Sequence, residues 1–199
     1  MRSTKEYERV YRNIINDNNL GDADELLKAY LSRLNAMYAS EQFKKHNVYL
    51  TMNVETIYAV IAMCLELKKF GLSDQEIIDA VDRGYEPKRK KFKSLIKCIN
   101  LLPNSYNIAK RWNLSDHAKR VEDGSITYDY FNVSDNKVEY HISVCKYVEM
   151  FECYGIRPLC KIFCNTDVMA YEGLTRHVEF IRHSDLSDGP ACYDEIIRK

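Results

Sequence analysis

Residues 126–143 read ITYDYFNVSDNKVEYHIS and mark a change of period along the chain. Two runs rich in Tyr, Val and Ile, residues 126–133 and 137–143, flank the turn formers of residues 134–136, as is typical of a β-hairpin. Successive strand side chains point to opposite faces. One face of the second run would carry Val138, Tyr140 and Ile142, and the other Glu139, His141 and Ser143.

The chain before the hairpin is dominated by helical spacing up to about residue 123. Apolar side chains recur at helical intervals in residues 27–38 and again in residues 54–65. Asn53 is suited to cap the second of these helices, and Gly71 can end it because glycine readily adopts the left-handed conformation. The first part of the chain is therefore predicted to be mainly helical.

A further helix is predicted to begin at Ser73, which forms a capping-box pattern with Glu76. Gly84 and Pro87 are expected to break this helix, because proline removes a backbone donor and clashes with the preceding turn. Residues 92–99 would then form a separate helix that ends before the next proline.

The chain after the hairpin combines helices with two more strands. Residues 145–154 form a predicted helix that stops at a glycine, and a second helix is expected over residues 158–172. Closing strands are predicted at residues 177–183 and 191–198. We therefore expect one α+β domain over residues 1–199, in which a helical N-terminal half packs on an antiparallel sheet of about four strands formed by the C-terminal half.

Composition sets limits on the partners and the compartment. The 29 Lys and Arg residues balance 29 Asp and Glu residues, so net charge provides no general attraction to nucleic acid or to an anionic membrane. The start of the chain has no apolar leader, and no apolar run is long enough to cross a membrane. The 7 cysteines are an odd number without paired spacing, which favours free thiols. We expect a cytoplasmic protein without a nucleic-acid or membrane partner; no feature indicates an oligomeric state.

A basic cluster between Lys88 and Lys97 allows two interpretations. It could contact phosphate or an acidic partner. A solvated helix face is the simpler interpretation, because Phe92 is the one aromatic side chain interleaved with these charges and base stacking needs several.

Four chemically active side chains share one face of the helix predicted at residues 158–172. Cys160, Cys164, Asp167 and Tyr171 follow one another at intervals of four, three and four residues. A carboxylate beside a thiol is costly as packing, since a buried Asp needs a partner or a proton. The pair could serve as a thiolate nucleophile with a base, as an acid and base acting on water, or as metal ligands. Spacing alone leaves these three roles open.

A family resemblance appears in residues 140–195. The pattern contains the run YHISVC at residues 140–145, GIRPL at residues 155–159 and FCNTD at residues 163–167, followed by Arg182 and Cys192. This order resembles the L-2-amino-thiazoline-4-carboxylic acid hydrolase family, with its F-C-x-x-D element, arginine strand and closing Cys strand. The chain departs from the family pattern in having Asp185 in place of Thr, and in having Tyr193 before Asp194 where the family has Asp before an aromatic residue.

The resemblance implies hydrolysis of a small cyclic amidine or isothiourea acid, with ring opening to a carbamoyl-cysteine-type product. It implies catalytic roles for Cys164, Asp167 and Cys192, with Asp167 holding the protonated amidine and Cys164 attacking its carbon or activating water. The substrate would carry a carboxylate, which Arg182 would bind through its planar fork. Side chains expected to line the same substrate site are Cys145, His141 and Tyr171. No cofactor is predicted.

A second function class stays open on the sequence. Cys145, Cys164 and Cys192, together with His141 or Asp167, could hold Zn²⁺, since three thiolates and one further ligand make a closed structural site. A closed site leaves no open position for catalysis. This alternative would make the protein a non-catalytic sensor or ligand-binding domain.

Overall fold

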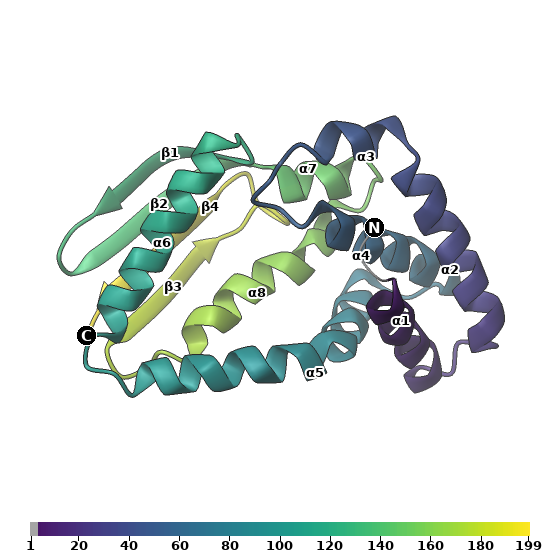
Figure 1. The fold of residues 1–199 in the computed structure, drawn as a ribbon, viewed down its shortest axis with the longest axis horizontal. Coiled ribbons are helices and arrows are strands. Elements are labelled where there is room, and N and C mark those ends of the chain that lie inside the picture. Colours follow the sequence, from purple (N-terminus) through teal and green to yellow (C-terminus); the bar gives the residue numbers. More distant parts are fainter. Residues whose placement is uncertain (1–3) are drawn as a thin grey trace.

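The computed structural model describes residues 4–199, which form an arrangement of helices beside one sheet (Figure 1). In chain order the elements are α1 (Lys5–Asp17), α2 (Ala23–Tyr38), α3 (Glu41–His46), α4 (Val54–Leu67), the 3-10 helix η1 (Lys68–Phe70), α5 (Asp74–Asn100), α6 (Ser105–Glu122), β1 (Ile126–Val133), β2 (Lys137–Cys145), α7 (Lys146–Glu152), the 3-10 helix η2 (Arg157–Cys160), α8 (Lys161–Glu172), β3 (Val178–Ser184) and β4 (Cys192–Arg198). The predicted α+β class is confirmed: helices come first, and a four-stranded antiparallel sheet is built from the C-terminal half.

The sheet has the strand order β1-β2-β4-β3, with each neighbouring pair antiparallel. The predicted hairpin is confirmed, and its turn is closed by the backbone N–H of Ser134, which donates to the carbonyl of Lys137 at 2.8 Å. Strand β4 lies between β2 and β3, so Tyr140 and Arg182 both pair with Asp194 across the strands. Residues from three strands are thereby brought into one row.

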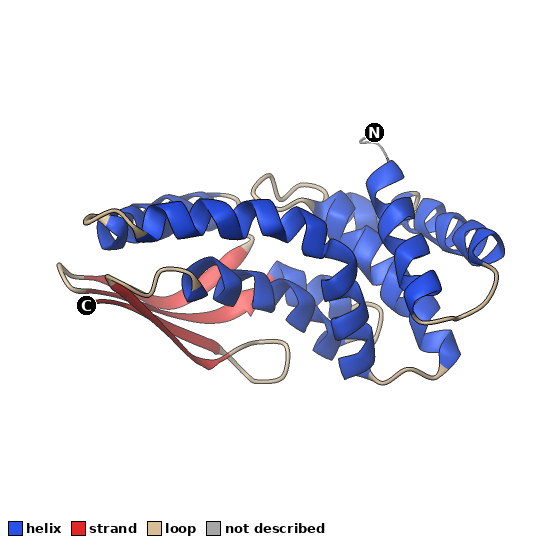
Figure 2. Ribbon diagram, turned by 90° about the horizontal axis from the view of Figure 1, so that it is seen from below, coloured by secondary structure: helices blue, strands red, loops and turns tan. Residues whose placement is uncertain are grey.

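Helices cover one face of the sheet (Figure 2). Side chains at alternate positions of β2, among them Val138, Tyr140 and Ile142, are buried on this face. The other face carries Glu139 and His141, which are partly exposed. The alternation predicted for residues 137–143 is therefore confirmed, and it decides which side chains can meet the helices.

Helix α4 forms the centre of the helical half. Its N-terminus is capped as predicted, with the Asn53 side chain accepting from the backbone N–H of Thr56. Ile57, Tyr58 and Ile61 are fully buried, because α2, α5 and α7 surround this helix. Each such side chain contributes about 1.5–3 kcal/mol through its removal from water. The predicted end of this helical segment at a glycine is also found. Gly71, directly after η1, has a φ of 73°, which lies in the left-handed region.

The predicted break at Gly84 and Pro87 is wrong, because α5 continues through both residues to Asn100. The capping box of Ser73 and Glu76 that begins this helix is confirmed. Tertiary packing overrides the local penalty: a Cβ at residue 84 would lie 2.9 Å from Cγ1 of Val10, so glycine is what lets α1 approach α5. The unbroken helix extends beyond the helical half and reaches α8.

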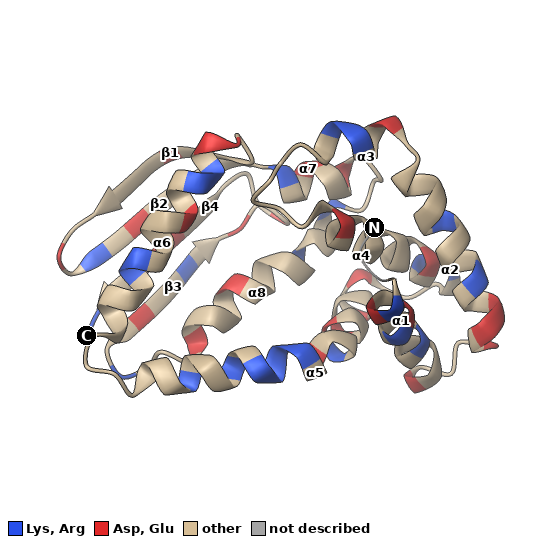
Figure 3. Cartoon of the chain, in the orientation of Figure 1, with Lys and Arg blue, Asp and Glu red and all other residues tan. Residues whose placement is uncertain are grey.

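The Lys and Arg residues of the basic cluster lie along α5 (Figure 3). Members of the cluster pair with nearby acids, Lys88 with Glu6 at 3.1 Å and Arg89 with Asp82 at 2.8 Å. These contacts fit the interpretation of a solvated helix face that is partly neutralised by its own chain. Among residues 4–199, no helix combines the length and the apolar character that crossing a membrane requires.

Replacing Gly84 with Ala tests the close approach of α1 and α5. Alanine favours an isolated helix by about 1 kcal/mol over glycine, but the new methyl group would collide with Val10. We expect the clash to dominate and to lower the free energy of unfolding by about 1–3 kcal/mol in chemical denaturation. Lys90→Ala, at an exposed position of the same helix, should change it by less than about 0.5 kcal/mol. Equal stability of the two variants would contradict this account.

Candidate active site

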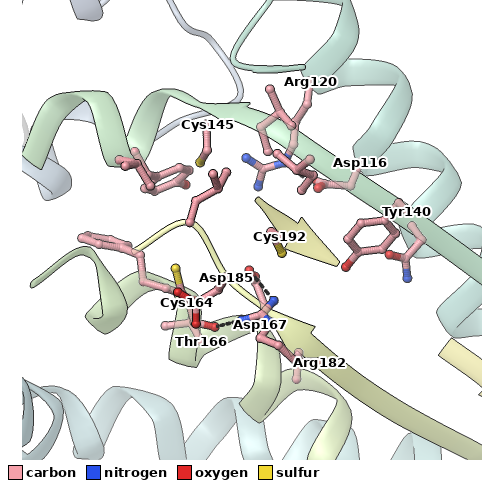
Figure 4. A pocket seen from close by; sticks show the side chains of 18 of the residues that line it. Asp116, Arg120, Tyr140, Cys145, Cys164, Thr166, Asp167, Arg182, Asp185 and Cys192 are labelled. Carbon is pink, nitrogen blue, oxygen red and sulfur yellow. Dashed lines mark hydrogen bonds and ion pairs between the residues drawn. The ribbon is translucent and has the colours of Figure 1, made fainter. Parts of the chain in front are cut away.

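A cavity of about 310 Å³ lies between the covered face of the sheet and helices α5, α6, α7 and α8 (Figure 4). This volume is at the lower end of the range for small-molecule sites and suits a compact ligand. Aromatic side chains form much of its wall, including Phe92, Trp112, Tyr128, Tyr140 and Tyr147. The sequence-predicted residues that line it are Cys145, Cys164, Asp167, Tyr171, Arg182 and Cys192.

Three separate parts of the C-terminal half supply these side chains. Helix α8 turns Cys164, Asp167 and Tyr171 to one side, because their spacing follows the helical repeat. Strand β4 places Cys192 on the covered face of the sheet, opposite Ile142 of β2. Cys145 lies at the end of β2, and the sulfur atoms of the three cysteines point into the same cavity (Figure 4).

Arg182 is fixed by bonds to the protein itself. Its Nε donates to Oδ1 of Asp194 at 2.8 Å, and its Nη2 donates to Oδ2 at 2.6 Å. Its Nη1 donates to the carbonyl oxygen of Cys164 at 2.7 Å. The Asp194 carboxylate, which is completely buried, also accepts from the Tyr140 hydroxyl at 3.0 Å.

This geometry corrects the role expected for Arg182. A fork that binds a substrate carboxylate must be free, and the fork of Arg182 already holds Asp194. The same guanidinium ties the backbone of α8 at Cys164 to strand β4. Arg182 therefore serves to fix the position of the Cys164 helix over the sheet.

Asp167 projects from α8 into the cavity. The cavity is open enough that 62% of the Asp167 side chain is exposed to solvent, although the cavity walls surround it. Its Oδ2 lies 3.7 Å from Nη2 of Arg182. The surrounding protein raises the pKa of Asp167 to about 6, while Arg182 and Arg120 act in the opposite direction. A carboxyl group with a pKa near neutrality suits proton transfer or the binding of a cation.

The thiols around Asp167 differ in their environments. Burial raises the pKa of Cys145 to about 11 and raises that of Cys192 strongly, so both stay protonated at neutral pH. A hydrogen bond to Cys164, followed by burial, raises the pKa of Cys160. Cys160 is fully buried and Cys164 is half-buried, so Cys160 is the proton donor of this pair and Cys164 is the thiol open to a ligand.

His141 lies away from this cavity, and the expectation that it shares a pocket with Cys145 is wrong. Its Nδ1 lies 2.6 Å from Oδ2 of Asp129, and its ring stacks on Tyr130. The alternation of β2 gives the physical reason, because the neighbouring Tyr140 faces the cavity and His141 must face the opposite way.

The zinc alternative finds no ligand set in the described structure. Within residues 4–199, His, Cys, Asp and Glu side chains form no group of three or more that could hold a metal ion. Cys145, Cys164 and Cys192 all line the cavity.

Three charged residues of the cavity wall were given no role on the sequence: Asp116, Arg120 and Asp185. Arg120 and Asp116 face the cavity from α6, and their spacing of four residues resembles an ordinary pair on a helix surface. Asp185, at one of the departures from the family pattern, is almost completely buried. Burial opposes ionisation of Asp185, but hydrogen bonds from Lys161 and Ser187 lower its pKa.

An α+β protein whose helix-covered sheet face encloses thiol, carboxyl and guanidinium groups has the build of a small-molecule site. The model of the L-2-amino-thiazoline-4-carboxylic acid hydrolase family matches residues 52–194, which is more than half of the chain. The chain belongs to this family, and the family's name implies a hydrolase. No match was found among curated proteins or among solved structures. The matched region begins just before α4 and includes every cavity-lining residue.

Removing Arg182 alone should strongly destabilise the fold. Arg182→Met leaves Asp194 buried without its charged partner, which costs about 3–5 kcal/mol of the free energy of unfolding. The double variant with Asp194→Leu should recover most of that loss, because no unpaired charge then remains. Arg12→Ala, which removes an exposed ion pair, should cost less than about 1 kcal/mol in the same denaturation assay. A loss of less than 1 kcal/mol for Arg182→Met would disprove the assigned anchoring role.

Proposed function

We propose that this chain hydrolyses a small cyclic amidine acid such as L-2-amino-thiazoline-4-carboxylate, opening the ring to a carbamoyl-cysteine-type product. The observation that carries the proposal is the pair of Cys164 and Asp167, which stand one helical turn apart on α8 and face one cavity. The family match over residues 52–194 supports the same reaction class.

Asp167 would act on the amidine. A protonated amidine carries two N–H groups in one plane, which suits the two oxygens of a carboxylate. Holding the amidinium keeps the carbon between nitrogen and sulfur electrophilic. The pKa of about 6 leaves Asp167 largely ionised at neutral pH, as this role requires.

Cys164 would attack that carbon. The thiolate adds to the carbon, a ring bond breaks with protonation of the departing ring atom, and water then releases Cys164 from the covalent intermediate. The net change is the addition of one water to the ring. Activation of water by Cys164 for direct attack gives the same product without the intermediate.

The other thiols of the cavity would support this step. Cys192 keeps its proton at neutral pH because burial raises its pKa, so it would donate a hydrogen bond to the departing ring atom, whose proton comes from the water that is consumed. Cys160, which keeps its proton, would donate a hydrogen bond to the sulfur of Cys164. Cys145 and Tyr171 would form the wall; the Tyr171 hydroxyl is already engaged by the Asn113 amide at 2.6 Å.

A direct assay tests the proposed reaction. Purified protein is incubated with L-2-amino-thiazoline-4-carboxylate, with hydantoin and with cyclic amidine carboxylates, while mass spectrometry follows the addition of one water. A thiol reagent then identifies the broken bond, because cleavage of carbon from sulfur releases a free thiol and cleavage of carbon from nitrogen does not. Absence of ring opening across the panel would refute the function.

Substitution of the two α8 residues should abolish turnover while the protein stays folded. Cys164→Ser keeps the shape but replaces the thiolate with a far weaker nucleophile, so activity should be undetectable. Asp167→Asn should lower kcat by about 10²–10⁴-fold, the usual contribution of a positioned acid or base.

Cys153 provides the control for these variants, and Cys160 tests the supporting hydrogen bond to Cys164. Cys153→Ser changes an exposed thiol outside the cavity and should leave turnover unchanged. Cys160→Ala should keep activity within about tenfold, since it removes one hydrogen bond of about 1 kcal/mol. Near-normal turnover by Cys164→Ser would exclude both the nucleophile and the water-activating roles.

The pH profile should report the ionisation of Asp167. The cavity raises its pKa to about 6, so the carboxylate that binds the amidinium is present above this pH and is lost below it. We expect kcat/KM to be level above about pH 6 and to fall roughly tenfold per pH unit below it. Asp167→Asn should remove this acidic limb from whatever activity remains, and a profile level down to pH 4.5 in the unmodified protein would contradict the assignment.

A further inference from the structure

Arg120 presents a guanidinium group to the cavity. Only some of the N–H donors of this group have a hydrogen-bond partner among the described residues. Its Nε donates to Oδ2 of Asp116 at 2.5 Å. Within residues 4–199, its buried Nη1 has no hydrogen-bond partner. An arginine has five N–H donors, and a buried donor without an acceptor is costly. The unused donors of Arg120 therefore point to an acceptor that arrives with a ligand.

Arg182 provides the comparison inside the same cavity. Both arginines line it, but Arg182 gives its fork to Asp194 and its remaining nitrogen to a backbone carbonyl. Asp116, the partner of Arg120, is 55% exposed and contacts only the Nε edge of the guanidinium. Of these two guanidinium groups, that of Arg120 is the one that can donate hydrogen bonds to a second carboxylate.

The surroundings of Arg120 keep it charged and hold it in place. Its side chain is only 17% exposed, and its Cζ lies 5.8 Å from the centroid of the Tyr147 ring. Burial lowers the pKa of Arg120, but Tyr147, Asp116 and Asp167 together raise it further, so the group stays protonated. Figure 4 shows the guanidinium end of Arg120 turned toward the space between Cys145 and Cys192.

We infer that Arg120 anchors the carboxylate of the substrate, and that the cavity has a cationic pole at Arg120 and an anionic pole at Asp167. This inference rests on the proposed function, because it assumes a ligand that carries a carboxylate and an amidinium. Such a ligand is complementary to the two poles in one orientation only. Reversing it would bring its carboxylate to Asp167 and its amidinium to Arg120.

The two poles give this site its specificity. Cys164 lies three residues before Asp167 on the same face of α8, so an amidinium held by Asp167 has its carbon near the sulfur. Arg120, on a different helix, would fix the other end of the ring. A ligand without the carboxylate loses charge-assisted hydrogen bonds to Arg120, which corresponds to about 10- to 100-fold in affinity.

Two half-ligands separate the poles experimentally. L-thiazolidine-4-carboxylate carries the carboxylate without the amidine, and 2-amino-2-thiazoline carries the amidine without the carboxylate. Their binding is measured by calorimetry or ligand-observed NMR, which requires no turnover. Arg120→Gln should weaken L-thiazolidine-4-carboxylate about 10- to 100-fold and should leave 2-amino-2-thiazoline within about threefold. Arg120→Lys, which keeps the charge without the fork, should fall between the two.

Lys119→Gln is the matched control, since it removes the same charge from the exposed neighbour of Arg120 on α6. It should leave the binding of both half-ligands unchanged. Asp167→Asn should show the reverse selectivity and weaken 2-amino-2-thiazoline alone. The thermal midpoint of each variant verifies that the binding losses do not reflect unfolding.

The outcomes distinguish this inference from the proposed function. Failure to hydrolyse L-2-amino-thiazoline-4-carboxylate, with Arg120-dependent binding of L-thiazolidine-4-carboxylate, would refute the reaction and support the anchor. Hydrolysis that keeps its preference for the carboxylate in Arg120→Gln would overturn the anchor and leave the reaction standing. Equal loss of both half-ligands in Arg120→Gln, or no binding of either by the unmodified protein, would also overturn the anchor.

Discussion

The site depends on the buried ion pair of Arg182 and Asp194. Two antiparallel strands, β3 and β4, place these residues opposite each other on the helix-covered face, where Asp194 has no access to water. A charge in such a position is tolerated only when it is paired and hydrogen-bonded, and here both oxygens of the carboxylate accept from Arg182 while Tyr140 adds a third bond. The pair thereby determines the sheet geometry beneath the cavity.

The third bond of Arg182 extends this constraint to the helix. Its donation to the Cys164 carbonyl joins α8 to the sheet at the position of the proposed nucleophile. Asp167 follows one turn later, close enough to Arg182 to be influenced by its charge and open enough to meet a ligand. One guanidinium thus orients a thiol and biases the ionisation of a carboxyl group. Rigid placement of this kind is what a reacting group needs, because small displacements are costly to catalysis.

The cavity separates its charges by element. Helix α8 provides the anion Asp167, and strand β3 provides the internally paired Arg182. Helix α6 provides Arg120, whose Nη1 has no hydrogen-bond partner among residues 4–199. The cavity is also lined by aromatic side chains and by the thiols of Cys145 and Cys192, which burial keeps protonated. A zwitterionic ring is complementary to this distribution of charge, and a larger or uniformly charged ligand is not. The charge pattern is therefore the physical basis of the proposed selectivity.

The sequence by itself determined the fold class, the hairpin and the alternation of its two faces, the capped starts of α4 and α5, and the shared helix face of Cys164, Asp167 and Tyr171. These features depend on local periods and turn chemistry, which are visible over a few residues. Only the tertiary structure decided that α5 continues through Pro87, that the guanidinium of Arg182 is paired with Asp194, and that Arg120 faces the cavity. Each of these depends on a partner distant in the chain, such as Val10 against Gly84 or β4 against β3. An arginine has the same local pattern whether its fork is occupied or free, so only the folded neighbours distinguish the two.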